Sequence, residues 1–259
     1  MVLKKQTHHG EMRVLQNVAK PLIIAHRGYK AKYPENTLSS FKAALYHHAA
    51  MVELDVTLSN DRKLVVIHDE TVDRTTNGSG NVCDYTLSEL KNLDAGSWFS
   101  EKFKGEPLPS LYEVLNLCAG KTLVNIEIKP EAVAADVQTD SIEFQVLDLV
   151  KAFSMTDSVL ISSFEPRVIE RISALNRSKP KTAFLAENPL DDKTLNFMVK
   201  HQVFSYNPDY RTLSHDQIQT VHTKGIMVFT YTVNSRNDAE KCFSIGVDGI
   251  FTDHLELMV

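Results

Sequence analysis

The sequence predicts an α/β protein, a distorted (β/α)8 TIM barrel with a small insertion after the second strand. The chain has 259 residues, which is close to the roughly 250 that such a barrel needs. Short, apolar, β-branched runs alternate along it with longer amphipathic stretches of helical period. This alternation indicates parallel strands joined by crossover helices.

Nine apolar runs are candidate strands, one more than an eight-stranded barrel holds. They are residues 22–26, 52–56, 64–68, 123–128, 159–164, 182–186, 203–206, 227–233 and 247–253. Only residues 57–63 join the second run to the third, and this is too short for a crossover helix. We therefore expect these two runs to form an antiparallel hairpin, which leaves eight strands for the barrel.

Amphipathic stretches lie between most of these runs. They are residues 37–48, 139–153, 166–175, 193–201, 215–225 and 236–246. In the first stretch, Leu38, Phe41 and Leu45 fall at helical spacing, and Asn36 is expected to be the N-cap.

Residues 69–108 interrupt the alternation. The segment is rich in Gly, Asn, Asp and Ser, so we expect a compact insertion rather than part of the barrel. Trp98, Phe99 and Phe103 are expected to form its local core over the mouth of the barrel. Arg74 is expected to hold a turn rather than to touch a substrate.

The composition is that of a globular protein able to bury a sizeable core, with 43% hydrophobic and 24% charged residues. The net charge of −5 argues against a nucleic-acid-binding protein, which would carry a basic face. It leaves a small anionic substrate open, because only the charge inside the cleft decides that.

The cysteines and the N-terminus bear on location. Cys83, Cys118 and Cys242 are far apart and odd in number, so we expect unpaired thiols in a reducing compartment. The first twenty residues have no apolar core of a signal peptide, and no apolar run approaches the roughly 18 residues of a membrane span. We expect a cytoplasmic protein with residues 1–20 as an N-terminal extension and residues 21–259 as the barrel.

Three carboxylates lie inside apolar strands. Glu53 and Asp55 are two positions apart, hence on one strand face, and Glu127 lies in a later run. A buried carboxylate needs a cation, and Arg27 and Lys129 are too few for three acids. Oxygen ligands favour a hard divalent metal, Mg²⁺ or Ca²⁺, whereas the alternative is a structural ion-pair network.

Two histidines end strands that feed the same mouth of the predicted barrel. His26 ends the first run and His68 ends the hairpin extension. Histidine transfers protons near neutral pH, so the pair predicts a general base and a general acid beside the metal. Arg27 and Lys129 would supply positive charge for a phosphate diester.

Several motifs together resemble the glycerophosphodiester phosphodiesterase family, over residues of about 21 to 255. They are His26-Arg27-Gly28, Pro34-Glu35-Asn36-Thr37, Glu53–Val56, His68-Asp69, residues 73–80, residues 126–129 and residues 248–253. The resemblance implies a distorted barrel with an insertion after the second strand, which matches the segment set apart above.

The resemblance also implies site roles. It makes Glu53, Asp55 and Glu127 the metal ligands, His26 and His68 the acid/base pair, and Arg27 and Lys129 the phosphate-binding residues. His26 would accept a proton and His68 would give one to the leaving alcohol, an order that the residues alone leave open. The implied reaction converts a glycerophosphodiester and water to glycerol 3-phosphate and an alcohol, through a cyclic phosphate where the glycerol hydroxyl attacks.

One departure from the family pattern concerns the substrate pocket. Tyr231 stands where the family often has Trp, and it keeps a flat surface for a glycerol unit. Phe164 and Tyr206 would line the pocket or pack in the core. Two other functions stay open: a lysophospholipase D or phospholipase C-like enzyme on the same barrel, and a non-catalytic phosphodiester-binding protein.

Overall fold

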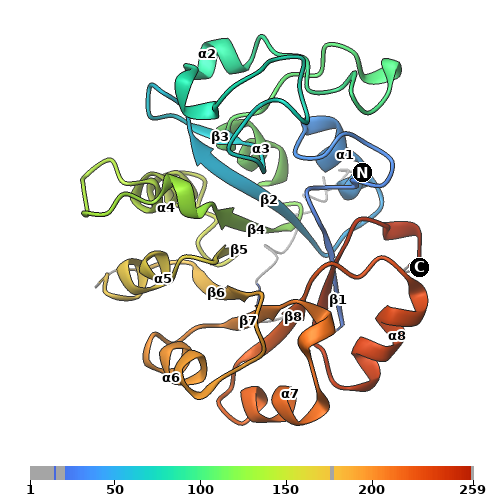
Figure 1. Ribbon diagram of the computed structural model, residues 1–259, viewed down its shortest axis with the longest axis vertical. Coiled ribbons are helices and arrows are strands. Elements are labelled where there is room, and N and C mark those ends of the chain that lie inside the picture. Colours follow the sequence, from blue (N-terminus) through green and yellow to red (C-terminus); the bar gives the residue numbers. More distant parts are fainter. Residues whose placement is uncertain (1–14, 16–20, 176–177, 258–259) are drawn as a thin grey trace, which may run out of the picture.

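The computed structural model describes Leu15, residues 21–175 and residues 178–257. Within these residues, eight parallel strands close into a barrel with helices on its outside (Figure 1). The barrel strands are β1 Leu22–Ala25, β2 Met51–Leu58, β4 Leu123–Ile128, β5 Val159–Ser163, β6 Lys181–Ala186, β7 Ser205–Pro208, β8 Met227–Thr230 and β9 Gly249–Thr252. The predicted barrel is confirmed.

The barrel closes where β1 pairs with both β9 and β2. A ninth strand among the described residues, β3 (Leu64–Val66), runs antiparallel to β2, with Val56 opposite Val66. This is the hairpin that the short connection of residues 57–63 predicted, and β3 stays outside the ring of eight.

Helices cover the outside of the barrel between consecutive strands (Figure 1). They are α1 Leu38–Tyr46, α3 Leu111–Cys118, α4 Ile142–Ala152, α5 Pro166–Ser173, α6 Asp192–Lys200, α7 His215–His222 and α8 Arg236–Ser244. The expected cap of α1 is wrong by one residue, because Thr37 Oγ1 accepts the bond from the Ser40 backbone N–H at 3.2 Å. Asn36 is left free to turn toward the barrel interior.

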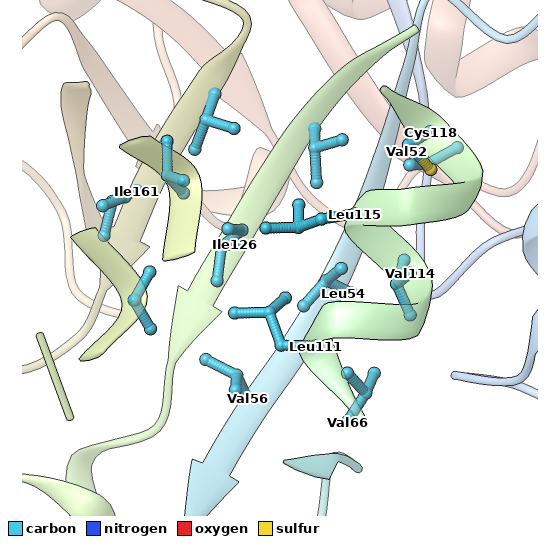
Figure 2. Close-up of a cluster of buried hydrophobic side chains, with 14 of the residues drawn as sticks. Val52, Leu54, Val56, Val66, Leu111, Val114, Leu115, Cys118, Ile126 and Ile161 are labelled. Atoms are coloured by element: carbon cyan, nitrogen blue, oxygen red, sulfur yellow. The ribbon is translucent and has the colours of Figure 1, made fainter. Parts of the chain in front are cut away.

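Helix α3 is an element that the sequence pattern did not predict. Ser110 and Glu113 cap its start with reciprocal hydrogen bonds, a capping box that satisfies two backbone donors. Figure 2 shows Leu111 and Leu115 pointing from α3 toward β2 and β4, and Val114 and Cys118 belong to the same buried cluster. This helix therefore supports the two strands that carry the acidic residues.

The half of the barrel interior at the amino ends of the strands is apolar. Its side chains come from both halves of the chain and are fully or almost fully buried, namely Leu15, Leu22, Ile24, Met51, Leu123, Leu160, Ala183, Phe229 and Phe251. Apart from Leu15, the expected extension of residues 1–20 lies outside the described residues. Because these side chains fill the amino-terminal half of the interior, we look for a ligand site at the carboxyl ends of the strands.

The segment between β3 and α3 lies beside β2 and β3, at the top of Figure 1. It contains the short helices η2 Val82–Asp84, α2 Leu87–Leu90 and η3 Glu101–Phe103. Its core is aliphatic, and the expectation of a core made by Trp98, Phe99 and Phe103 is wrong. These rings pack edge to face in a row on the outside, with centroids 5.7 and 5.8 Å apart.

None of the helices in the described part of the chain has the length and apolar character that crossing a membrane requires.

Candidate active site

The three acidic residues predicted as metal ligands lie together at the carboxyl end of the barrel. Glu53 and Asp55 point inward from β2, and Glu127 points inward from the neighbouring β4, where it is in register with Asp55. One carboxylate oxygen from each residue lies within 4.8 Å of the others. The alternation of a strand places both β2 acids on the interior face, and the parallel register places Glu127 beside them.

Burial and mutual repulsion disturb the ionisation of this acid cluster. The pKa of Glu53 is raised well above its usual value by burial and by the charges of Asp55 and Glu127. Burial and Asp55 likewise raise the pKa of Glu127 to about 7. Burial alone would also raise the pKa of Asp55, but nearby Arg27 and Lys129 outweigh it and lower the pKa.

A divalent cation would fit this set of donors. Three carboxylates offer the oxygen ligands that Mg²⁺ and Ca²⁺ prefer, and a charge of +2 would remove the repulsion that raises the pKa of Glu53 and Glu127. Two basic side chains lie beside the cluster: Lys129 Nζ is 3.0 Å from Glu127 and 3.7 Å from Asp55, and Arg27 Nε is 3.3 Å from Asp55. Two positive charges do not neutralise three carboxylates, so an excess of negative charge is left for a cation.

Arg27 is held in the site by a tight turn after β1. Its backbone has a positive φ of 55°, and its own N–H donates to Glu53 at 2.7 Å. Gly28 follows at φ 81°, where a Cβ atom would meet Ser40 Oγ at 2.2 Å. The turn therefore needs glycine at this position, and it aims the guanidinium at the acid cluster.

His26 is held by a carboxylate that directly follows the last strand of the barrel, β9. Its Nδ1 lies 2.7 Å from Asp253 Oδ1, and Asn234 Nδ2 donates to the other Asp253 oxygen at 2.9 Å. Asp253 fixes the orientation of the ring through Nδ1, so that Nε2 is the ring nitrogen that can exchange a proton with a substrate. Burial lowers the pKa of His26, although the bond to Asp253 opposes this, so the neutral ring is favoured.

His68 is held in the same way by the residue that follows it. Its Nδ1 lies 2.6 Å from Asp69 Oδ1, and its side chain is 31% exposed against 15% for His26. Burial lowers the pKa of His68 as well, and the charge of Asp55 opposes the change. Both histidines thus have a carboxylate on Nδ1, and they differ in exposure.

Most of these groups line one cavity of about 890 Å³, although Asp55 and Asp253 are not among its lining residues. Its lining includes His26, Arg27, Glu53, His68, Glu127 and Lys129. Phe164 and Tyr231 line the same cavity, with ring centroids 6.0 Å apart, and the Tyr231 hydroxyl donates to the Ala186 carbonyl at 2.8 Å. Tyr206 instead is buried between the barrel and its helices.

Sequence reasoning missed several residues that support this site. Asn36 Nδ2 donates to Asp55 at 2.8 Å, and Glu35 accepts from Arg27 Nη1 at 2.9 Å. Asp253 orients His26, and Arg74 bonds to both Glu35 and Asp69. The signal was present, because each of them belongs to a polar motif quoted above, but no pattern within one motif says which distant residue it meets.

A sequence profile described as the Glycerophosphoryl diester phosphodiesterase family matches residues 26–257. A glycerophosphodiester phosphodiesterase of Caldanaerobacter subterraneus is 40% identical over 241 residues, which cover 93% of this chain and 97% of that protein. One from Bacillus subtilis is 32% identical over 247 residues, covering 91% of this chain and 84% of the relative.

Solved structures agree with this likeness. An Oleispira antarctica phosphodiesterase, in complex with the product sn-glycerol-3-phosphate, superimposes with a TM-score of 0.84 at 28% identity, covering 92% of this chain and 96% of the other. The glycerophosphodiester phosphodiesterase of Thermotoga maritima gives 0.72 at 27% identity, with coverage of 92% and 96%.

Proposed function

The chain belongs to the glycerophosphoryl diester phosphodiesterase family and is an enzyme of that activity, and we propose how its residues perform the hydrolysis. In this proposal Glu53, Asp55 and Glu127 hold a divalent cation, and two histidines transfer protons. The observation that carries it is the clustering of three carboxylates, two of which line one cavity together with two imidazoles that are each held by a carboxylate.

The acid cluster would hold Mg²⁺ or Ca²⁺ between the two histidines. When bound, the cation supplies positive charge that stabilises the developing negative charge on phosphate and lowers the pKa of an attached hydroxyl. Arg27 and Lys129 keep their own positive charge, because neighbouring carboxylates raise the pKa of both against the effect of burial, chiefly Asp55 for Arg27 and Glu127 for Lys129. They would bind the non-bridging phosphate oxygens.

His26 is proposed as the general base. Its Nδ1–H donates to Asp253, which leaves the lone pair of Nε2 to accept a proton. Its lower exposure and lowered pKa keep it neutral near pH 7, as a base requires. In the first step Nε2 takes the proton of the glycerol hydroxyl next to the phosphate, and the hydroxyl oxygen bonds to phosphorus.

His68 is proposed as the general acid of this step. The bond from phosphorus to the alcohol oxygen breaks, its electron pair stays on that oxygen, and protonated His68 gives the oxygen its Nε2 proton. Burial lowers the pKa of His68, and Asp55 and the bond from Nδ1 to Asp69 oppose this change and favour the protonated ring. Water then opens the cyclic phosphate with the two histidines in reversed roles, which returns both to their starting states.

Tyr231 is proposed as the flat surface against which the glycerol unit lies. It lines the same cavity as the phosphate-binding residues, and its bond to the Ala186 carbonyl and its edge-to-face contact with Phe164 fix the ring. A fixed aromatic wall would position the substrate without a charge of its own.

A metal panel tests the cation. Chelator-treated protein should lose activity on glycerophosphocholine, measured as release of glycerol 3-phosphate, and recover it with Mg²⁺ or Ca²⁺. Full activity in excess chelator would refute metal dependence. The same assay with lysophosphatidylcholine checks the substrate class. A preference for this lipid would mean that the substrate is a lysophospholipid rather than a water-soluble diester.

Histidine variants test the acid/base pair. His26→Ala and His68→Ala should each lower kcat by about 10²–10⁴-fold, the usual contribution of general catalysis. His222→Ala is a matched control, because His222 Nε2 also lies 2.8 Å from an aspartate, Asp248, but at the opposite end of the barrel. Wild-type activity in His26→Ala would remove the basis of the mechanism.

The three cysteines bear on where the reaction takes place. Cys83, Cys118 and Cys242 are unpaired, and the last two are buried. Unpaired thiols suit a reducing environment, so a cytoplasmic location is part of the proposal. A shift in electrophoretic mobility after thiol labelling of protein taken from intact cells would test whether Cys83 stays reduced there.

A further inference from the structure

Arg74, from the segment that follows β3, binds two carboxylates with one guanidinium. Its Nη1 and Nη2 donate to the two oxygens of Glu35 at 3.0 and 2.8 Å. Its Nε and Nη2 donate to the two oxygens of Asp69 at 2.6 and 3.1 Å. The guanidinium plane therefore fixes the orientation of both carboxylates at once.

Each of these carboxylates holds a residue of the active site. Asp69 Oδ1, which accepts from Arg74 Nη2, also lies 2.6 Å from Nδ1 of His68. Glu35 Oε1, which accepts from the same Nη2, also accepts from Nη1 of Arg27 at 2.9 Å. Two successive hydrogen bonds thus link Nη2 of Arg74 to His68 through Asp69, and two others link it to Arg27 through Glu35.

The surroundings of this network favour a positioning role over a purely local one. The Glu35 side chain is 2% exposed, and its pKa is lowered to about 2, because the bonds and charges of Arg74 and Arg27 outweigh the effect of burial. Arg74 itself is 44% exposed and lies outside the residues that line the cavity. It can therefore reach the substrate only through the two carboxylates.

Lysine could not make the same contacts. The guanidinium uses three nitrogens in a rigid plane to hold four oxygens, whereas an ammonium group is a point charge on a flexible chain. The network thus depends on the shape of the side chain as well as on its charge.

We propose that Arg74 is a positioning residue that holds His68 in the orientation for proton donation and Arg27 against the phosphate, so that the segment after β3 completes the active site. The inference rests on the proposed function, in which His68 gives its Nε2 proton to the leaving alcohol oxygen as the bond to phosphorus breaks. Losing Arg74 frees Asp69 to rotate, and the ring of His68 turns with it.

Two substrates with different leaving groups test this role. Glycerophosphocholine releases an alkoxide that needs a proton, whereas the p-nitrophenyl ester of glycerol phosphate releases a stable phenolate that needs none. Arg74→Gln should lower kcat on glycerophosphocholine by about 10²-fold, which is the low end of a general acid's contribution. On the p-nitrophenyl ester it should lower kcat by only about tenfold. Equal losses on both substrates would overturn the proposal.

Further variants separate shape from charge and from folding. Arg74→Lys should show the same dependence on leaving group, and full activity in it would refute the argument from shape. Asp69→Asn leaves Arg74 and Glu35 joined, so it tests the link to His68 even if Arg74→Gln does not fold. Arg62→Gln is the matched control, because Arg62 donates to Asp140 at 3.0 Å with a similar exposure and lies away from the cavity.

His68→Ala on the same two substrates distinguishes the two levels of the argument. If its loss does not depend on the leaving group, the assignment of His68 as the acid is wrong, and the proposed function fails at that point. If His68→Ala shows the dependence and Arg74→Gln does not, the role of Arg74 alone is refuted.

Discussion

Replacing Glu127 by glutamine should stabilise the metal-free protein at high pH while damaging the enzyme. In the folded protein the pKa of Glu127 is raised from 4.5 to about 7, by burial and by Asp55. Each pKa unit corresponds to about 1.4 kcal/mol, so an ionised Glu127 costs the metal-free fold about 3 kcal/mol above pH 7. Glutamine has no charge to bury, and it also removes the repulsion between the carboxylates of Glu127 and Glu53.

The sign of the pH dependence follows from the raised pKa. The folded state keeps its proton up to about pH 7, whereas the unfolded chain loses it near pH 4.5, so the stability of the wild type falls as pH rises between these values. Glu127→Gln removes this fall. The attraction of Lys129 at 3.0 Å already opposes the rise in this pKa, so its loss is included in the figure above, and we expect a net gain of about 1–3 kcal/mol at pH 8 and much less at pH 5.

Urea denaturation in excess chelator at pH 5 and pH 8 measures this difference, with Glu240→Gln on the exposed face of α8 as the control. With metal present the result should reverse, because the variant loses a charged ligand and activity should fall by about 10²–10³-fold. A variant less stable than wild type at pH 8 in chelator would mean that Glu127 serves mainly as a structural partner of Lys129, and the reasoning would be refuted.

Three further outcomes are expected. Because burial lowers the pKa of His26 and Asp253 opposes this, Asp253→Asn should lower kcat and move the acidic limb of the pH–rate profile to lower pH; a limb that stays in place contradicts the pairing. Leu115→Ala, which empties a buried site on α3, should cost about 2–5 kcal/mol in urea denaturation without changing which substrate is used. Gly28→Ala should cost about 2 kcal/mol or more and nearly abolish activity, because its backbone is left-handed and its Cβ would meet Ser40; an unchanged melting temperature argues against the strained turn.

The barrel could be predicted from the sequence because its strands are apolar and regularly spaced, whereas α3 could not be separated from the loop before it. Leu111, Val114, Leu115 and Cys118 do have helical spacing. The helix has only eight residues, however, and it depends for stability on packing against β2 and β4 rather than on its own propensity. Its sequence therefore stands out little from the polar segment that precedes it.

The candidate site divides along a similar line. Strand alternation was enough to bring Glu53, Asp55 and Glu127 together, because parallel strands end at the same edge. Asp253, the residue that orients His26, was missed, since it lies 227 residues away in the sequence. Contacts of that separation follow from closing the barrel, and no local pattern in one sequence contains them.

The strand β2 explains why activity and stability can be changed separately in this fold. Leu54 and Val56 point outward into the core beneath α3, while Glu53 and Asp55 point inward, above the apolar layer that contains Met51. Alternating apolar and polar residues usually indicate a strand with one face in water. In this closed barrel the inward carboxylates of Glu53 and Asp55 are almost fully buried, so each needs a partner, and the repulsion between them is what a cation would relieve. Outward substitutions on β2 should therefore change the free energy of unfolding alone, whereas inward ones should change cation binding and catalysis together with the pH dependence of stability.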